Sequence, residues 1–262
     1  MIRQANRHTV CYRFARLAVF SEITHAIFTR LGGNSEGPYW SLNVGAQCGD
    51  RPEDVQANEL TMLGDLGLQP GDVVTAAQVH GSRVAVVGSA DKGRILPATD
   101  GLLTAEAGVF LFLRFADCLP VLLYDPLHKA LALVHVGWRG CLAGVLGNTV
   151  LTMVSTFGTR PSDVVAGLGP GIGPCCYEIG PDLVYKIRSV FGEESGLLRQ
   201  AEAAKTYFDL PGAASQQLGR AGILQIESAA MCTCCHTGEF FSHRGQGGRA
   251  GRFGVVCGLR DR

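Results

Sequence analysis

The sequence predicts a protein of the α+β class, in which mixed β-sheets are flanked by helices. Hydrophobic residues make up 47% of the 262 residues and charged residues only 18%, so the chain has enough apolar side chains for a large core. Apolar runs of strand length alternate with segments that carry helix start and stop signals. No internal repeat or Pro/Ser-rich linker divides the chain, and we therefore expect one domain over residues 1–262.

The centre of the chain is rich in predicted strands. Their apolar runs are bounded by Gly, Pro and Asp and cover residues 73–79, 84–87, 109–116, 120–124 and 130–136. Several runs are continuously apolar rather than alternating, which is typical of strands covered on both faces. Helices or a second sheet must therefore pack against them. Two further strands are predicted at residues 223–226 and 253–257.

Helices are predicted on either side of these strands. Pro52 occupies a first-turn position and is followed by EDVQANELTMLGDLG, a helical pattern ended by glycine. Further helices are expected over residues 138–157, 181–191 and 211–218. Residues 192–207 form the most polar and least patterned segment, and we expect it to be a surface excursion.

The charge balance disfavours several classes of partner. Lys plus Arg and Asp plus Glu both number 23, so the net charge is zero and no global field favours nucleic acid or an anionic membrane. The N-terminus has no apolar signal-peptide core, and the longest apolar runs are too short to span a bilayer. We therefore expect a cytoplasmic protein with reduced cysteines that acts on a small molecule. The sequence does not indicate an oligomeric state.

A candidate metal site lies in ADCLPVLLYDPLHKALALVHVGWRG, residues 116–140, where Cys118 and His135 stand at the ends of two predicted strands. A second histidine, His80, is found upstream in QVHG. Two imidazoles and a thiolate hold zinc through three ligands and leave its fourth position open, as in catalytic zinc sites. The spacings of 38 and 17 residues require the fold to bring the three together. If the fold does not bring them together, the histidines are explained as ordinary hydrogen-bonded side chains and Cys118 as a buried thiol.

The surroundings of these residues are polar. Asp117 beside Cys118 is a charge that an apolar pocket would not tolerate unpaired, which favours a turn at a polar site. His135 leads directly into a predicted helix start, where free N–H groups and the guanidinium of Arg139 would suit an anion such as phosphate. A glycine-rich segment at residues 245–251 follows Arg244 and is a second candidate for a basic loop that closes over an anion.

A separate cysteine pattern occurs at MCTCCH, where Cys232 and Cys235 have CxxC spacing. This spacing supplies half of a zinc knuckle or a redox pair. The other half would have to come from the adjacent Cys175 and Cys176, and neighbouring cysteines are awkward ligands for a tetrahedral site. The pattern by itself therefore does not establish a structural zinc.

Seven motifs, taken in order, resemble one family. They are HAIFTRLGGNSEGPYWSLNVG, QVHG, TDGLLT, ADCLPVLL, HVGWRG, GPGIGPCCYEIG and CTCCHTGEFFSHR. The same series is seen in the laccase-domain or polyphenol oxidase family, whose members are now usually described as purine nucleoside phosphorylases. The resemblance implies mixed sheets between helices in α/β/β/α layers, related to the catalytic domain of cytotoxic necrotizing factor deamidases. It also implies that His80, Cys118 and His135 are the metal ligands and catalytic residues.

The resemblance further implies zinc-associated chemistry on purine nucleosides. The expected reaction is phosphorolysis of adenosine, inosine or methylthioadenosine to free base and ribose 1-phosphate, with adenosine deamination left open as a further activity. Arg30, Arg139 and Arg244 are the candidate phosphate ligands, and Asn43 is the candidate hydrogen-bond partner of sugar or base. The chain departs from the family pattern at Val136 and at Gly245, the latter removing one arginine.

Two alternatives use the same three residues. A copper-dependent laccase is implied by the family's older description, but the seven histidines are scattered without HxH pairs, which does not suit a multicopper centre. A single copper at His80, Cys118 and His135 would remain compatible with weak phenol oxidation. In the second alternative, Cys118 is a nucleophile activated by either histidine, giving a cysteine hydrolase or amidase that acts on cell-wall peptides.

Overall fold

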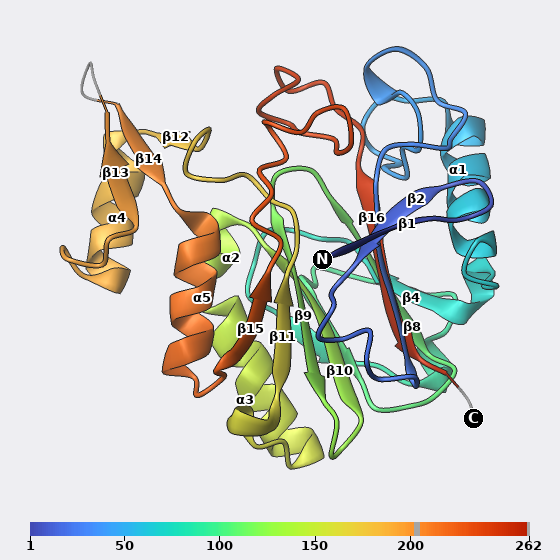
Figure 1. Cartoon of the computed structure of the whole chain (residues 1–262), viewed down its shortest axis with the longest axis horizontal. Coiled ribbons are helices and arrows are strands. Elements are labelled where there is room, and N and C mark those ends of the chain that lie inside the picture. The colour runs from blue at the N-terminus through green and yellow to red at the C-terminus, as the bar shows by residue number, and fades with distance from the viewer. Residues whose placement is uncertain (202–204, 261–262) are drawn as a thin grey trace.

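The computed structural model describes residues 1–201 and 205–260, and within them two large mixed sheets lie face to face (Figure 1). The first sheet has the order β1 (Ile2–Ala5), β2 (Val10–Arg13), β3 (Ile23–Phe28), β16 (Phe253–Leu259), β8 (Phe110–Phe115), β4 (Val73–Ala76) and β6 (Ile95–Leu96). Its strands are antiparallel except that β8, β4 and β6 run parallel to one another.

The second sheet contains the strands on which the candidate site is built. Its order is β15 (Gln225–Ser228), β11 (Val165–Leu168), β9 (Leu119–Asp125), β10 (Ala130–Val136), β7 (Gly101–Thr104) and β5 (Val84–Val86). Pairs at both edges are parallel and the central pairs are antiparallel. A small third sheet comprises β12 (Glu178–Ile179), β14 (Thr206–Phe208) and β13 (Leu198–Gln200).

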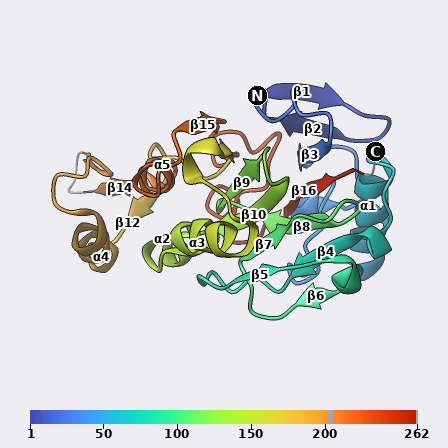
Figure 2. The ribbon, with the colours of Figure 1, turned by 90° about the horizontal axis from the view of Figure 1, so that it is seen from below.

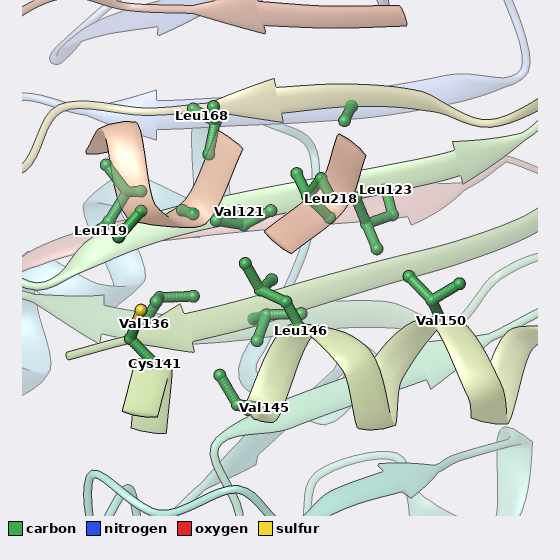
Figure 3. Close-up of a cluster of buried hydrophobic side chains, with 14 of the residues drawn as sticks. Leu119, Val121, Leu123, Val136, Cys141, Val145, Leu146, Val150, Leu168 and Leu218 are labelled. Atoms are coloured by element: carbon green, nitrogen blue, oxygen red, sulfur yellow. The ribbon is translucent and has the colours of Figure 1, made fainter. Parts of the chain in front are cut away.

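Helices cover the outer faces of both large sheets (Figure 2). Their bounds are α1 (Pro52–Gly64), α2 (Trp138–Leu142), α3 (Val145–Phe157), α4 (Pro181–Phe191) and α5 (Leu210–Arg220). Met62 and Leu63 of α1 pack on the first sheet. The other outer face is covered by α2, α3 and α5, whose apolar side chains pack with those of β9, β10 and β11 in the cluster of Figure 3. The predicted α/β/β/α layers are therefore confirmed.

The alternation of side chains along β9 and β10 assigns each residue to one of two cores. Leu119, Val121 and Leu123 of β9 face the helices. Leu122 of β9 and Leu133 of β10 face the first sheet instead. Both strands are buried along their whole length, as their continuous apolar sequences predict. Burial on both faces fixes the register of the pair, because a slip by one residue would exchange the two faces.

The predicted elements are mostly found, with boundary shifts. The strand at residues 130–136 and the helix at 181–191 have the predicted bounds. The predicted helix over residues 138–157 is wrong in one respect, because Gly144 adopts a positive φ of 79° and divides it into α2 and α3. The strands before residue 30 were not predicted, since their short runs are partly polar.

The polar segment at residues 192–207 is not wholly irregular. It contributes β13 and the start of β14 to the small sheet, which lies with α4 at the periphery of the molecule (Figure 1). Residues 202–204 of this segment lie outside the described residues. Throughout the part of the chain that the structure describes, no helix has both the length and the apolar content needed to cross a bilayer.

Candidate metal centre

The antiparallel pairing of β9 and β10 brings Cys118 and His135 together. His135 pairs with Pro120, and Val136 pairs with Leu119, so the end of β10 lies beside the start of β9. Cys118 immediately precedes β9 and therefore faces the residues that end β10. The separation of 17 residues in sequence is thus bridged by one hairpin.

Both side chains project from the same side of the second sheet. His135 lies on the same face of β10 as Leu133 and points into the space between the two sheets. Its ring centroid is 5.4 Å from that of Phe115. Cys118 packs against the same inter-sheet core. His135 is buried and Cys118 is half-buried, so the apolar core limits the rotation of both donors.

His80 reaches the pair from a connection that crosses between the sheets. The chain leaves β4 in the first sheet and enters β5 in the second, and His80 lies in that connection with a positive φ of 61°. Non-glycine residues rarely adopt this conformation, so the surrounding contacts must hold it. Its ring centroid lies 4.9 Å from that of His135 in an edge-to-face arrangement. The exposed His80 forms the solvent side of the group.

A buried carboxylate, Asp100, holds the crossing connection in place. Its Oδ1 accepts a hydrogen bond from the backbone N–H of His80 at 2.9 Å, and its Oδ2 accepts from Gly81 at 2.7 Å and from Val79 at 3.3 Å. These bonds offset the cost of burying the charge, since each donor is an otherwise unpaired backbone group. Asp100 thereby explains the unusual backbone of His80.

The same carboxylate orients His135. The Nδ1 atom of His135 lies 2.9 Å from Oδ1 of Asp100, and the His135 backbone N–H donates to the Asp100 carbonyl at 2.7 Å. Metal-binding histidines commonly donate their second ring nitrogen to a carboxylate, which fixes the tautomer and turns the other nitrogen toward the metal. The contact therefore assigns the proton to Nδ1 and leaves Nε2 of His135 for a ligand.

The three donor atoms meet the distance requirement of a metal site. The candidate ligand atoms of His80, Cys118 and His135 all lie within 4.8 Å of one another. Zinc–nitrogen and zinc–sulfur bonds of about 2.1 and 2.3 Å place tetrahedral donors roughly 3.6 Å apart, so closing the group needs only small side-chain movements. Imidazole and thiolate also suit zinc or copper chemically. The residues present therefore fit a metal ion of this class.

Electrostatics couple Cys118 to the histidines. Burial alone would raise the pKa of the Cys118 thiol, but the charge and hydrogen bonds of His135 and His80 outweigh it and lower that pKa below its ordinary value. Burial would lower the pKa of His135, whereas the Cys118 sulfur and the Asp100 carboxylate raise it. Cys118 is therefore favoured as a thiolate, the form that binds metals and acts as a nucleophile.

Two glycines make room for the site. An added Cβ at Gly137 would lie 3.1 Å from the Cys118 Sγ and 3.1 Å from Cδ2 of His80. At Gly140 it would lie 2.6 Å from the carbonyl oxygen of Gly81. The glycines of HVGWRG thus let the start of α2 pack directly on the donors and on the His80 connection.

Asp117 anchors the other side of the site. As the sequence predicted, this charged side chain has polar partners. Its Oδ1 accepts from the hydroxyls of Thr233 at 2.7 Å and Ser242 at 2.6 Å, and its Oδ2 accepts from the backbone N–H of Arg244 at 2.7 Å. The backbone N–H of Ile172 donates to the Asp117 carbonyl at 2.8 Å. Three distant loops are therefore tied to the residue that precedes Cys118.

Arg30 and Asn43 are buried and engaged in structural hydrogen bonds. The Arg30 guanidinium donates to the carbonyl oxygens of Trp40 and Thr237, and lies 4.4 Å from the ring centroid of Phe241. Asn43 donates to Oδ2 of Asp50 at 2.8 Å and accepts from two backbone N–H groups. Both side chains hold loops together, and their proposed contacts with substrate stay predictions.

The other two arginines are exposed. Arg244 donates to the carbonyls of Cys176 and Glu178 at 3.1–3.2 Å and lies over the Tyr177 ring. Arg139 stacks over the Trp138 ring at 4.8 Å. Among the described residues, no hydrogen-bond acceptor or carboxylate pairs with the Arg139 guanidinium, so its donors are available. Arg139 lies two residues after Gly137, the glycine that packs against Cys118 and His80.

Sequence reasoning missed Asp100 and Tyr177 as site residues. Asp100 stands in the TDGLLT motif, and nothing in the local sequence indicates a role for this acid. Tyr177 is half-buried between Phe208 and Arg244, and burial together with the nearby Cys118 sulfur raises the pKa of its hydroxyl. Only the tertiary structure places Tyr177 beside the site, since 59 residues separate it from Cys118.

The fold and the site define a class: a layered α+β protein with two facing sheets and a group of two histidines and one cysteine that could hold a metal ion at the strand ends between them. The model of the family described as multi-copper polyphenol oxidoreductase laccase matches residues 24–260. The chain belongs to this family.

Its relatives match over nearly their whole lengths. The purine nucleoside phosphorylase of Bacteroides thetaiotaomicron is 36% identical, with 94% of each chain covered. The purine nucleoside phosphorylase YlmD of Geobacillus stearothermophilus is 35% identical, with 92% of each chain covered. The crystal structure of YlmD from that organism superposes with a TM-score of 0.92 at 34% identity, covering 98% of each chain.

Proposed function

We propose that this protein is a zinc-associated purine nucleoside phosphorylase that acts on adenosine, inosine or methylthioadenosine. The observation that carries the proposal is the group of three donors within 4.8 Å, open to solvent on the His80 side. Three donors with one exposed side are typical of catalytic rather than structural zinc. The names of the relatives supply the nucleoside substrate class.

The proposed reaction transfers a ribosyl group to phosphate. An oxygen of phosphate forms a bond to C1′ of the ribose while the bond from C1′ to N9 of the purine breaks. The bonding electrons leave with the base, which takes up a proton to become the free purine, and ribose 1-phosphate is the second product. Zinc, when bound by His80, Cys118 and His135, supplies a Lewis acid that stabilises negative charge at the site.

Asp100 contributes by positioning. It holds the Nδ1 proton of His135 and the backbone of His80, so that both imidazoles are fixed before substrate arrives. Preorganised groups need no reorientation as charge develops, which is the main source of electrostatic catalysis. Asp100 is therefore a positioning residue that acts through the two histidines.

Arg139 is the phosphate ligand that the structure favours. Arg30 and Arg244 already donate to carbonyl oxygens, whereas the Arg139 guanidinium is exposed and stacked on Trp138. Its planar fork matches two phosphate oxygens. Loss of such charge-assisted hydrogen bonds costs about 1.5–3 kcal/mol. We expect Arg139→Ala to raise the KM for phosphate roughly 10- to 100-fold.

A nucleophilic Cys118 is a second candidate function, because its half-buried thiol is favoured as a thiolate next to His135. It would make the protein a cysteine hydrolase. Alkylation separates the two: a phosphorylase with zinc bound protects Cys118 from iodoacetamide, whereas a hydrolase is inactivated by it in the metal-free state. Copper-dependent phenol oxidation, suggested by the family's description, is tested with the same protein loaded with copper.

The deciding experiment incubates the zinc-loaded protein with adenosine or inosine, with and without phosphate, and separates the products by chromatography. Phosphate-dependent release of adenine or hypoxanthine supports the proposal, and formation of inosine from adenosine would add deamination. The matched control for Arg139→Ala is Arg220→Ala, since Arg220 is also an exposed helical arginine stacked on an aromatic ring. Absence of free base at every zinc loading would rule out the phosphorylase.

A further inference from the structure

A second cluster of metal-binding side chains lies outside the site described above. It consists of Cys175, Cys176, Cys232 and Cys235, whose sulfur atoms all lie within 4.8 Å of one another. The Cys235 Sγ is 3.5 Å from that of Cys175 and 3.4 Å from that of Cys176. The four cysteines come from two turns, and Cys175 and Cys235 are 60 residues apart in sequence.

These separations suit a metal rather than a disulfide. A zinc–sulfur bond of about 2.3 Å places the sulfurs of a tetrahedral site roughly 3.8 Å apart. A disulfide requires about 2.05 Å between two sulfurs and leaves the remaining pair without a role. The four sulfurs instead surround one point, as four ligands of a single ion do.

The two turns have conformations that direct their cysteines toward one another. The backbone N–H groups of Cys176 and Tyr177 both donate to the Gly173 carbonyl at 3.0 Å, so the chain turns tightly at the adjacent pair. This turn resolves the difficulty that neighbouring cysteines pose in an extended chain. In the CxxC segment, the N–H groups of Cys235 and His236 donate to the Cys232 carbonyl at 3.1 and 3.0 Å.

Backbone donors also surround the most buried sulfur. The N–H of Gly173 donates to the Cys232 Sγ at 3.2 Å, and the N–H groups of Cys234 and Cys235 face the same sulfur. Donors of this kind stabilise a thiolate, which is the form that coordinates a metal. An added Cβ at Gly173 would lie 3.2 Å from the Cβ of Cys232 and 3.4 Å from the Cys175 Sγ. Glycine therefore permits this close approach.

We propose that Cys175, Cys176, Cys232 and Cys235 bind a second, structural metal ion of the zinc class. Four thiolates fill a tetrahedral coordination sphere and leave no position for substrate, which is the pattern of structural sites. An ion here joins the turn after β11 to the turn after β15, which also pair through a bridge between Gly171 and Cys232. A second ion at these cysteines is proposed whether or not the protein is a phosphorylase.

The second ion would brace the first site through Asp117. Thr233 in the CxxC turn donates to Oδ1 of Asp117, and Ile172 before the Cys175 turn donates to its carbonyl. Asp117 in turn precedes Cys118 and has a positive φ of 78°. Fixing the two turns therefore fixes the backbone conformation from which Cys118 reaches the catalytic donors.

The test is zinc stoichiometry in the full-length chain, measured by elemental analysis after zinc saturation and extensive desalting. We expect two zinc ions in the wild type, one in Cys118→Ala and one in Cys175→Ser/Cys235→Ser. Cys234→Ser is the matched control, because Cys234 lies in the same turn but outside the quartet, and it should keep both ions. Zinc in Cys118→Ala supports the quartet whether or not the protein cleaves nucleosides.

Cobalt substitution provides a readout that does not depend on the folding of the serine variant. Cobalt(II) in a four-thiolate site gives much stronger sulfur-to-metal charge-transfer absorption than it gives with one thiolate and two imidazoles. Cys118→Ala loaded with cobalt should retain most of the wild-type absorption. Loss of zinc and of this absorption in Cys118→Ala would overturn the proposal. A disulfide within the quartet would also overturn it. Mass spectrometry of the unreduced wild type would then give a mass lower than that of the reduced chain by two hydrogen atoms, and peptide mapping would place the bond between two of the four cysteines.

Discussion

The two donor clusters of this protein differ in where the fold places them. His80, Cys118 and His135 stand at the ends of buried strands and at a crossing between sheets, and Asp100 orients two of them. The cysteine quartet is built from two surface turns, and two of its members are exposed. The first cluster has mixed donors and an open side, whereas the second has four identical donors that can enclose an ion.

The difference matches the two roles that we propose, a reactive site for the first cluster and a structural site for the second. Three donors held by a rigid core leave a coordination position for reaction, while four thiolates close it. The first cluster depends on Asp100, which holds the backbone of His80 and the ring of His135 in place. The second depends on the conformation of the two turns that carry its cysteines. The two sites should therefore respond differently to substitution.

The largest effect is expected from Cys118→Ala, which removes the only sulfur of the first cluster. Phosphorolysis should fall to background, because two imidazoles alone bind zinc weakly and the reacting position is lost. One zinc per chain should remain, held by the quartet. Product chromatography and elemental analysis of the same preparation check both parts. Full activity in this variant would show that the first cluster does not carry the reaction.

Asp100→Asn should come next, with zinc affinity or activity lowered about 10- to 100-fold. The amide keeps one oxygen, but its NH₂ group faces either a backbone N–H or the Nδ1 proton of His135, which are both donors. Zinc affinity is measured by competition with a chromophoric chelator.

Asp125→Asn is the matched control for that substitution. Asp125 is a buried carboxylate that contacts the Nδ1 atom of His128 at 2.7 Å and two backbone N–H groups, in the same sheet but outside both clusters. It should leave zinc affinity unchanged while lowering stability to a similar extent. An equal loss of zinc affinity in Asp100→Asn and Asp125→Asn would show that Asp100 acts only through the stability of the fold.

A smaller effect is expected from Gly137→Ala. The added methyl would lie 3.1 Å from both Cys118 and His80, and the backbone at Gly137 is extended, so the substitution crowds the ligands without straining the chain. We expect zinc affinity to fall about tenfold. Gly147→Ala, whose Cβ meets nothing within 4 Å, should bind zinc as the wild type does. Equal affinities in the two variants would contradict the close packing described above.

The smallest effect on either cluster is expected from the substitution His25→Gln. His25 is buried on β3 and accepts a hydrogen bond from the Phe14 backbone N–H at 2.9 Å. Burial and the charge of Arg13 lower the pKa of His25 to about 4. The unfolded chain takes up this proton near pH 6.5, so stability is present above that pH and declines as the pH falls toward 4. The loss amounts to roughly 3 kcal/mol, since one pKa unit corresponds to about 1.4 kcal/mol.

Urea unfolding between pH 7 and pH 4.5 measures that loss. His25→Gln should flatten the pH dependence and leave the zinc stoichiometry at neutral pH unchanged. An equally steep decline in His25→Gln would assign the acid sensitivity to other groups, including the metal ligands.

The sequence by itself determined the class of the fold and proposed the three candidate donors of the first cluster. The continuous apolar runs of β8, β9 and β10 predicted strands covered on both faces, because burying a polar side chain costs free energy unless it finds a partner. The ordered motifs then singled out His80, Cys118 and His135. Short, partly polar strands such as β1 gave no comparable signal.

Tertiary structure alone decided how the donors meet and which polar residues serve them. Strand register set His135 beside Pro120, and the packing of the chain brought Asp100, the residue before β7, into contact with both histidines. Burial of Arg30 depends on loops that no local pattern specifies. The quartet likewise exists only because two distant turns pack together. Local sequence fixes secondary structure and donor chemistry, whereas pairing over long separations depends on the packing energy of the whole core.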